Sequence, residues 1–284
     1  MRIAFATCSA FPAGIEDDHL VWRVLGAEYR VWNDNSVDWE MYDRVILRSV
    51  WDYTTRVEEF LSWCHSIGAP RLRNSPELVA FNADKRYLGE LSVPVVPTAF
   101  LAPGDPLPSF EGEIVVKPNI SAGARNTGRF GGSSHSEAAS LVERIGASGR
   151  VALVQPYQAT IDEMGETAIV FLDGELSHVL RKHPVLTGDG VAPVSDHVLG
   201  VAEAMLRDDL VVAGAASASE RALAHRVIGE VSERFGTPLY ARVDMVLDSD
   251  HQPMLLELEA IEPNLYLSSA AGASERFAEA IRRR

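Results

Sequence analysis

The stretches that decide the fold are Tyr240-Ala241-Arg242-Val243-Asp244-Met245-Val246 and Leu255-Leu256-Glu257-Leu258-Glu259. In an extended strand, side chains two residues apart project from the same face. Arg242 and Asp244 therefore share one face of the first strand, and Glu257 and Glu259 share one face of the second. If the two strands pair as a hairpin, three carboxylates and one guanidinium meet on a single face.

Three carboxylates on one face repel each other and are costly to remove from water. A solvated hairpin face would avoid that cost, but the flanking stretches Met245-Val246-Leu247 and Met254-Leu255-Leu256 are apolar and favour a buried sheet. A hard divalent cation would balance the charge, and oxygen-only ligands combined with substrate phosphates suit Mg²⁺. We therefore predict Asp244, Glu257 and Glu259 as candidate metal ligands.

The chain has three lysines among its 26 basic residues, Lys85, Lys117 and Lys182. Lys117 ends a predicted strand over 114–117, and residues 119–132 form a loop with four glycines and two arginines. A lysine is a compact charge suited to phosphate contact, and a pliable loop offers backbone N–H donors to phosphate oxygens. The loop matches neither a P-loop nor a dinucleotide-binding fingerprint. Together with the carboxylates, these features predict a nucleotide-phosphate site.

The first 75 residues alternate strands with helices. Apolar runs predict strands over 2–7, 29–32 and 44–47, and helical spacing of apolar residues predicts helices over 17–25 and 57–67. Such alternation is typical of a small parallel-sheet α/β unit, whose ligands gather at the carboxyl ends of strands. The loop Arg48-Ser49-Val50-Trp51-Asp52-Tyr53 follows the third strand, so it is either a ligand contact or a surface loop with buried aromatic residues.

The remainder of the chain changes character. A Pro-rich connector covers 93–108, and hairpins dominate after residue 151, including one with an Asp173-Gly174 turn. Residues 183–216 predict a long active-site loop with one short helix. A helix over 224–235 precedes the last two strands.

Composition limits the classes of function. The 284-residue chain has a formal net charge of −14, which disfavours nucleic acid as a partner. No apolar run reaches the length of about 18 residues that a membrane span requires, and the N-terminus lacks a secretory signal. The cysteines Cys8 and Cys64 are too few for a disulfide framework. We expect a cytoplasmic acidic enzyme that acts on a small molecule, as a monomer or a homo-oligomer.

The motifs between residues 82 and 267 resemble those of the ATP-grasp superfamily of carboxylate–amine ligases, which hold ATP between two α+β lobes. All three lysines fall on motif positions of that family. The resemblance implies ATP and Mg²⁺ as ligands and an α/β fold of three parts. We expect an N-terminal parallel-sheet domain over 1–92, a small lid lobe over 93–155, and a C-terminal lobe over 156–284 that carries the metal acids.

The resemblance also implies a set of ATP-binding residues. They match family positions that contact phosphate, adenine or ribose, and they are Lys85, Lys117, Ser121, Gly123, Gln155, Tyr157, Glu163, Glu166 and Lys182. Ser121 and Gly123 belong to the glycine-rich lid, and Gln155 and Tyr157 belong to the interlobe hinge. Glu166 matches the ribose acid, with Glu163 as a weaker candidate. Arg181 is the alternative to Lys182 at the γ-phosphate.

The metal and catalytic positions of the family also have counterparts. Asp244 and Glu257 match metal ligands, whereas Glu259 stands where the family usually has Asn, and it adds a negative charge. Arg242 falls where the family places an arginine that stabilises an oxyanion, and Lys182 assists at the transferred phosphate. The implied chemistry is formation of an acyl phosphate, followed by attack of a nitrogen nucleophile.

Residues 48–53, 181–183 and 257–265 are similar to a narrower group, the cyclo-ligases of D-cycloserine biosynthesis. That group closes O-ureido-D-serine into a ring at the expense of ATP, so the nucleophile belongs to the same molecule as the carboxylate. The resemblance makes Arg48, Asp52 and Asn264 candidate contacts for an amino-acid-like substrate, with Asp17 and Asp18 as weaker anionic candidates. A surface ion pair between Arg48 and Asp52 is the alternative interpretation of that loop.

Two other functions share part of the pattern. Glutathione-synthetase-like and ribosomal-protein-modifying ATP-grasp ligases join two molecules, so an intermolecular ligase is the first alternative. A non-catalytic ATP-binding protein is the second, and the presence of the metal acids argues against it.

Overall fold

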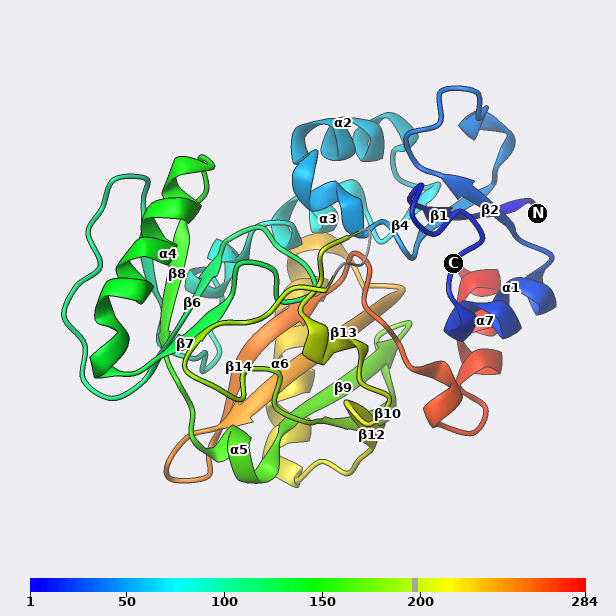
Figure 1. Ribbon diagram of the computed structural model, residues 1–284. Coiled ribbons are helices and arrows are strands. Elements are labelled where there is room, and N and C mark those ends of the chain that lie inside the picture. The colour runs from blue at the N-terminus through cyan, green and yellow to red at the C-terminus, as the bar shows by residue number, and fades with distance from the viewer. Residues whose placement is uncertain (196–198) are drawn as a thin grey trace.

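A computed structural model describes residues 1–195 and 199–284 and contains three β-sheets. Figure 1 shows the N-terminal domain in blue, the lid sheet in green, and the C-terminal sheet between them with the long helix α6 against it. The predicted three-part α/β architecture is confirmed, because the strands form three separate sheets and not one doubly wound sheet. The predicted boundaries at 92/93 and 155/156 stay predictions.

The N-terminal domain is a parallel sheet of order β2-β1-β3-β4. Its elements are β1 (Ile3–Thr7), α1 (Glu16–Leu25), β2 (Glu28–Val31), β3 (Arg44–Leu47), α2 (Val57–Ile67), β4 (Leu72–Arg73) and α3 (Pro76–Asn82). The strands are short; β1 is buried along its whole length, and β3 is buried at Val45, Ile46 and Leu47. This is the alternation that the sequence predicts.

The lid lobe is an antiparallel sheet of order β11-β7-β6-β8-β5, covered by one helix. Its elements are β5 (Ala99–Leu101), β6 (Ile114–Pro118), β7 (Gly128–Phe130), α4 (His135–Ala147), β8 (Ala152–Pro156) and β11 (Gly190–Val191). Helix α4 buries Ala138, Leu141, Val142 and Ile145 against the sheet, at the helical spacing of the sequence.

The C-terminal lobe is an antiparallel sheet of order β12-β10-β9-β13-β14. Its elements are α5 (Thr160–Met164), β9 (Glu166–Leu172), β10 (Glu175–Lys182), β12 (Val211–Ala213), α6 (Ala218–Phe235), β13 (Tyr240–Leu247) and β14 (Pro253–Glu259). The predicted turn between β9 and β10 is present, and Asp173 and Gly174 have φ of 54° and 79°. Two consecutive positive φ values are what a tight hairpin turn requires.

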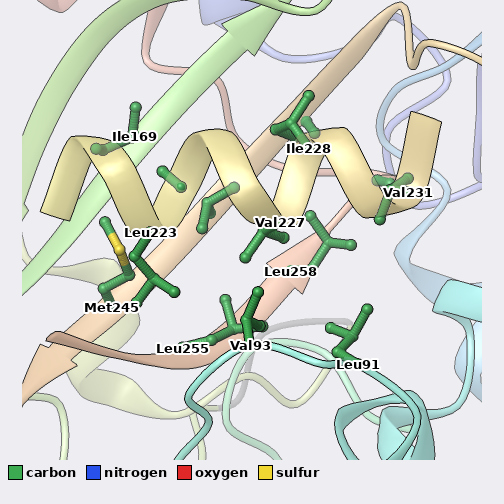
Figure 2. Packing of buried hydrophobic residues seen from close by; sticks show 14 of the residues in the cluster. Leu91, Val93, Ile169, Leu223, Val227, Ile228, Val231, Met245, Leu255 and Leu258 are labelled. Carbon is green, nitrogen blue, oxygen red and sulfur yellow. The ribbon is translucent and has the colours of Figure 1, made fainter. Parts of the chain in front are cut away.

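Helix α6 packs on one face of this sheet. Figure 2 shows Leu223, Val227 and Val231 pointing from α6 toward Met245, Leu255 and Leu258 of β13 and β14. The helix begins with a capping box, in which the Ser217 side chain accepts from the Glu220 amide and the Glu220 side chain accepts from the Ser217 amide. Five apolar residues of β13 and β14 therefore pack in the cluster beneath α6, namely Ala241, Val243, Met245, Leu255 and Leu258, and the charged residues face away from it.

Segments from different parts of the chain interlock around the C-terminal sheet. The Tyr87 hydroxyl and the Asn82 amide bond to the backbone of Leu258 and Ala260 at the end of β14. Helix α7 (Ala273–Arg283) returns to pack beside α1 of the N-terminal domain (Figure 1). Short 3-10 helices complete the structure, namely η1 (Trp39–Met41), η2 (Trp51–Thr55), η3 (Lys85–Gly89), η4 (Gly132–Ser134), η5 (Glu203–Leu206) and η6 (Leu267–Ser269).

The predicted long loop over 183–216 carries β11, η5 and β12, and residues 196–198 of it lie outside the described residues. A search of the described helices finds none with the length and apolar character of a membrane span.

Candidate active site

A cavity of about 440 Å³ lies where the three units meet. Most of the site residues expected from the sequence line it, and they come from all three parts of the chain. They are Lys85, Lys117, Ser121, Gly123, Gln155, Tyr157, Glu166, Lys182, Arg242, Asp244, Glu257, Glu259 and Asn264.

The acidic face predicted from strand periodicity is present. Strands β13 and β14 pair antiparallel, with Asp244 directly opposite Glu257 and Arg242 directly opposite Glu259. Asp244 is 1% exposed, which excludes a solvated hairpin face. The alternate residues Val243, Met245 and Leu258 point into the core beneath α6. The two-residue period of the strands thus separates the charged face from the apolar one.

Two basic residues surround the Asp244 carboxylate. Nε and Nη2 of Arg242 donate to its two oxygens at 2.8 Å each, and Nζ of Lys182 lies 2.8 Å from Oδ2. Burial alone would raise the pKa of Asp244, but Arg242 and Lys182 outweigh it and hold the pKa well below the ordinary range. Arg242 also pairs with Glu259, and its Nη1 donates to the Asn264 carbonyl at 2.9 Å.

Strand alternation settles which of two neighbouring basic residues faces the cavity. Lys182 lies 2.8 Å from Glu166, its cross-strand partner on β9, and both line the cavity. Burial would lower the pKa of Lys182, but the charges of Asp244 and Glu166 raise it above the ordinary lysine value. Arg181 projects to the other face of β10, where Nη1 donates to Thr167 Oγ1 at 2.6 Å. Lys182, and not Arg181, is therefore the candidate at the γ-phosphate.

The two remaining lysines come from segments outside the C-terminal sheet. Nζ of Lys85 lies 3.1 Å from Glu257 Oε1 and donates to the Ser121 carbonyl at 2.9 Å, so it joins β14 to the glycine-rich loop. Lys117 is buried at the end of β6. Burial lowers the pKa of Lys117, against the opposing charge of Glu257. Burial disfavours the charged form of Lys117, and a phosphate bound beside these lysines would stabilise that form.

Negative charge is in excess at the end of β14. Burial, with Asp244 and Glu257 nearby, raises the pKa of Glu259 to about 7 although Arg242 opposes the rise. Burial and the charge of Glu259 raise the pKa of Glu262 to about 8, against the opposing charge of Lys85. A cation bound here would relieve this excess.

The oxygen-only donor set of Asp244, Glu257 and Glu259 fits Mg²⁺ in its chemistry. Within the described part of the chain, no group of three or more His, Cys, Asp or Glu side chains gathers into a metal-binding cluster. The carboxylates instead bond to Arg242, Lys182 and Lys85. Mg²⁺ therefore stays a proposal that rests on the donor chemistry and on the uncompensated charge.

The hinge residues lie at the junction of lid and C-terminal lobe. The Gln155 amide donates to Thr98 Oγ1 at 2.8 Å. The Tyr157 hydroxyl donates to Asp162 Oδ1 at 2.6 Å, and the Arg129 guanidinium lies 3.6 Å from the centroid of its ring. Val96, Ile161 and Leu256 pack in one apolar cluster with Tyr157 and also line the cavity. The character of this cluster suits a planar base held by a rigid hinge.

The glycine-rich loop takes a conformation that favours glycine. Gly123 has φ of +63°, and its carbonyl accepts from the Ala202 amide at 2.8 Å. A Cβ added at Gly123 would lie 2.5 Å from Val201 Cγ1. On the same loop, Nη2 of Arg125 donates to Thr54 Oγ1, which ties the lid to the N-terminal domain.

Arg48, Asp52 and Glu163 do not line the cavity. Arg48 is 2% exposed, and its guanidinium pairs with Asp18 at 2.8 Å, so it is neither accessible to substrate nor part of a surface pair with Asp52. The Asp52 carboxylate accepts from Trp32 Nε1 at 2.8 Å. Glu163 is exposed on α5. The polar groups after β3 thus turn inward to partners that lie far away in the sequence, whereas Glu163 lies at the surface, so the structure does not bring these three residues into the cavity.

Trp51 and Tyr53 line the cavity, as expected for a loop at the carboxyl end of a parallel strand. Three further cavity residues were not expected as site residues from the sequence, namely Phe11, Arg125 and Glu262. Glu262 lies in a segment without periodicity, and nothing in the local pattern indicates its direction.

Three comparisons identify proteins that are similar to this chain. A family model described as the N-terminal domain of the D-cycloserine synthetase DcsG matches residues 3–74. The cycloserine biosynthesis protein DcsG of Streptomyces lavendulae is 35% identical over 279 residues, covering 92% of this chain and 90% of that protein. The crystal structure of the D-cycloserine synthetase DcsG is 32% identical, with a TM-score of 0.87, and the match covers 100% of this chain and 99% of that one.

More distant structures share the fold. A RimK domain ATP-grasp protein from Sphaerobacter thermophilus is 14% identical with a TM-score of 0.65, covering 99% of this chain and 100% of that one. A D-alanine–D-alanine ligase from Bacillus anthracis complexed with ATP is 14% identical with a TM-score of 0.63, covering 99% and 95%. The fold is therefore the ATP-grasp fold.

Proposed function

Because this chain belongs to the D-cycloserine synthetase family of ATP-grasp ligases, we propose that it uses ATP to close O-ureido-D-serine into the ring of D-cycloserine. The observation that carries the proposal is the composition of one cavity. It brings three lysines from three segments of the chain against the facing carboxylates Asp244 and Glu257.

The cavity residues act in two chemical steps of the proposed reaction. Lys85, Lys117 and Lys182 hold the phosphates of ATP while the substrate carboxylate attacks the γ-phosphate. Asp244, Glu257 and Glu259 would hold Mg²⁺, which would neutralise part of the phosphate charge. In the second step, the oxygen-bound ureido nitrogen of the same molecule attacks the acyl phosphate, and phosphate leaves as the five-membered ring closes. Water then removes the carbamoyl group from the ring nitrogen as CO2 and ammonia, which leaves D-cycloserine.

Arg242 is suited to the second step. Its guanidinium is buried and held by Asp244, Glu259 and the Asn264 carbonyl, so its orientation is set before substrate arrives. A pre-oriented donor stabilises the oxyanion of a tetrahedral intermediate without reorganisation. The intramolecular nucleophile adds a high effective concentration at the carbonyl carbon.

The test is ADP release with a single carboxylate substrate, followed by mass spectrometry of the product. Wild-type protein with ATP, Mg²⁺ and O-ureido-D-serine should release ADP and form the cyclic product without an added amine. Glu257→Gln should lower this ADP release by at least about a hundredfold, because a ligand of the charge-neutralising ion is lost. The matched control Glu58→Gln changes an exposed glutamate on α2 and should leave the rate unaltered.

The alternatives predict different results in the same assay. ADP release that requires a second, separate amine would identify an intermolecular ligase. ATP binding without ADP release, across a panel of small carboxylates that includes ureido amino acids, would identify a non-catalytic ATP-binding protein. Undiminished turnover of Glu257→Gln would remove Glu257 from the metal site.

We also propose that the protein is cytoplasmic and that its partner is a small amino-acid-like substrate. Cys8 and Cys64 are both free and buried, which suits a reducing compartment. Light scattering of the purified protein would distinguish a monomer from a homo-oligomer.

A further inference from the structure

One carboxylate in the cavity differs from the others in its surroundings. Four cavity carboxylates form ion pairs with arginine or lysine, namely Glu166, Asp244, Glu257 and Glu259. Glu262, which follows β14, lines the same cavity and forms no ion pair with any residue that the structure describes. Its charged neighbours are Glu259 and Glu257, with Lys85 as the opposing charge. A partly buried carboxylate in such surroundings favours a cation from outside the chain.

A second acceptor lies two residues further along. Oδ1 of Asn264 is buried, belongs to a cavity-lining residue, and accepts no hydrogen bond. A buried acceptor without a partner is unfavourable, and a donor from a ligand would remove that cost. Arg242 Nη1 donates to the backbone carbonyl of Asn264 at 2.9 Å. Pro263, which lies between Glu262 and Asn264, restricts the backbone. The segment therefore presents two acceptors in a held conformation beside Arg242.

The N-terminal domain contributes aromatic rings to the wall of the cavity. Phe11, Trp51 and Tyr53 line it, and the Phe11 and Trp51 rings meet edge to face at 5.2 Å. Tyr53 is 4% exposed, and burial together with the nearby charge of Glu262 raises the pKa of its hydroxyl. Aromatic rings attract cations and exclude water, which strengthens a charge-assisted hydrogen bond.

We propose that Glu262 and Asn264 bind the α-ammonium group of the substrate. An ammonium offers three N–H donors and one positive charge, and this pair offers a carboxylate and an amide oxygen. In an α-amino acid the ammonium and the carboxylate are separated by one carbon, which agrees with Asn264 bonding directly to Arg242. The inference rests on the proposed function, since it takes the substrate to be an amino acid whose carboxylate reacts beside Arg242.

The experiment compares two ligands that differ only in the ammonium group. O-ureido-D-serine is the substrate, and 3-(ureidooxy)propanoic acid, which lacks the α-amino group, is measured as a competitive inhibitor. Glu262→Gln should raise the KM for O-ureido-D-serine by at least about tenfold, because a charge-assisted hydrogen bond is lost. The Ki of the inhibitor should stay unchanged or fall, and the KM for ATP should stay within about twofold.

Two further variants keep the comparison specific. Asn264→Ala should raise the KM for O-ureido-D-serine in the same selective way, whereas Asn264→Asp keeps an acceptor oxygen and should retain more of the affinity. Glu58→Gln on the surface of α2 is the control for loss of one carboxylate.

Each outcome separates the inference from the function on which it rests. Two results with Glu262→Gln would overturn ammonium recognition and assign Glu262 to the metal. One is an equal loss of affinity for O-ureido-D-serine and for the inhibitor, and the other is a raised Mg²⁺ requirement with both ligands. An unaltered KM for O-ureido-D-serine would overturn it as well. If wild-type protein does not turn over O-ureido-D-serine at all, the proposed function fails, and this inference fails with it.

Discussion

At the scale of single residues, burial decides what a charged side chain does. Arg48 follows β3, yet its guanidinium lies inside the molecule, 2.8 Å from Asp18. It also stands 5.5 Å from the ring centroid of Tyr240 and 5.6 Å from that of Phe277. Arg48 therefore joins the N-terminal domain to β13 and α7, and it has a structural role in place of the substrate contact expected from the sequence.

Arg48→Ala should lower the free energy of unfolding by about 3–5 kcal/mol, because it leaves Asp18 buried without its partner. At a temperature where the variant is folded, the KM for ATP and for the substrate should match wild type. Urea denaturation and steady-state kinetics measure the two quantities. The control Arg207→Ala breaks an exposed pair with Asp209 and should change stability by at most about 1 kcal/mol. A raised substrate KM with unaltered stability would return Arg48 to the substrate site.

At the scale of elements, the glycine-rich loop requires glycine at Gly123, where packing is close, but has room for a side chain at Gly131. Gly123 combines a positive φ with close contact to Val201. Gly131, in the same loop, has φ of −88°, and an added Cβ would meet open space. The loop therefore contains both a constrained glycine and a matched unconstrained one.

Gly123→Ala should lower kcat/KM for ATP by about tenfold or more. The left-handed backbone costs an alanine of order 1–3 kcal/mol, and the clash with Val201 displaces the loop from the phosphates. Gly131→Ala should leave kcat/KM within about twofold. Steady-state kinetics at varied ATP concentration tests both variants. Equal kinetics of the two would mean that the loop tolerates displacement, and that its conformation at Gly123 does not position ATP.

At the scale of the whole molecule, the C-terminal helix joins the first domain to the last lobe. One hydrophobic cluster contains Phe5 and Val21 of the N-terminal domain, Val170 of β9, and Phe277 and Ile281 of α7. Figure 1 shows α7 beside α1 at the N-terminal end of the molecule. The two ends of the chain thus share a core, and the domains should unfold together.

Phe277→Ala should lower the free energy of unfolding by about 3–5 kcal/mol, because a ring that is 0% exposed leaves a cavity in this shared core. The transition in urea should stay a single one when tryptophan fluorescence reports the N-terminal domain and circular dichroism reports the whole chain. Glu279→Ala, exposed on the same helix, is the control and should be close to neutral. Two separated transitions in wild-type protein would contradict the shared core.

Much of the candidate site could be predicted because it depends on short-range geometry. The separation of Asp244, Glu257 and Glu259 from Val243 and Leu258 follows from the two-residue period of a strand. The same period distinguishes Lys182 from Arg181 once the partner strand is known. Both features depend on backbone geometry that a few consecutive residues determine.

The sequence by itself therefore determined the alternation of elements, the tight turn at Asp173-Gly174 and the acidic face of the last hairpin. Only the tertiary structure decided which polar side chains pair across long separations, such as Arg48 with Asp18 in an ion pair and Arg125 with Thr54 in a hydrogen bond. It also decided that Glu262 faces the cavity with no basic partner among the described residues. The physical reason is that periodicity is set locally by backbone dihedral angles, whereas a pairing between distant segments depends on how the buried cores bring those segments together.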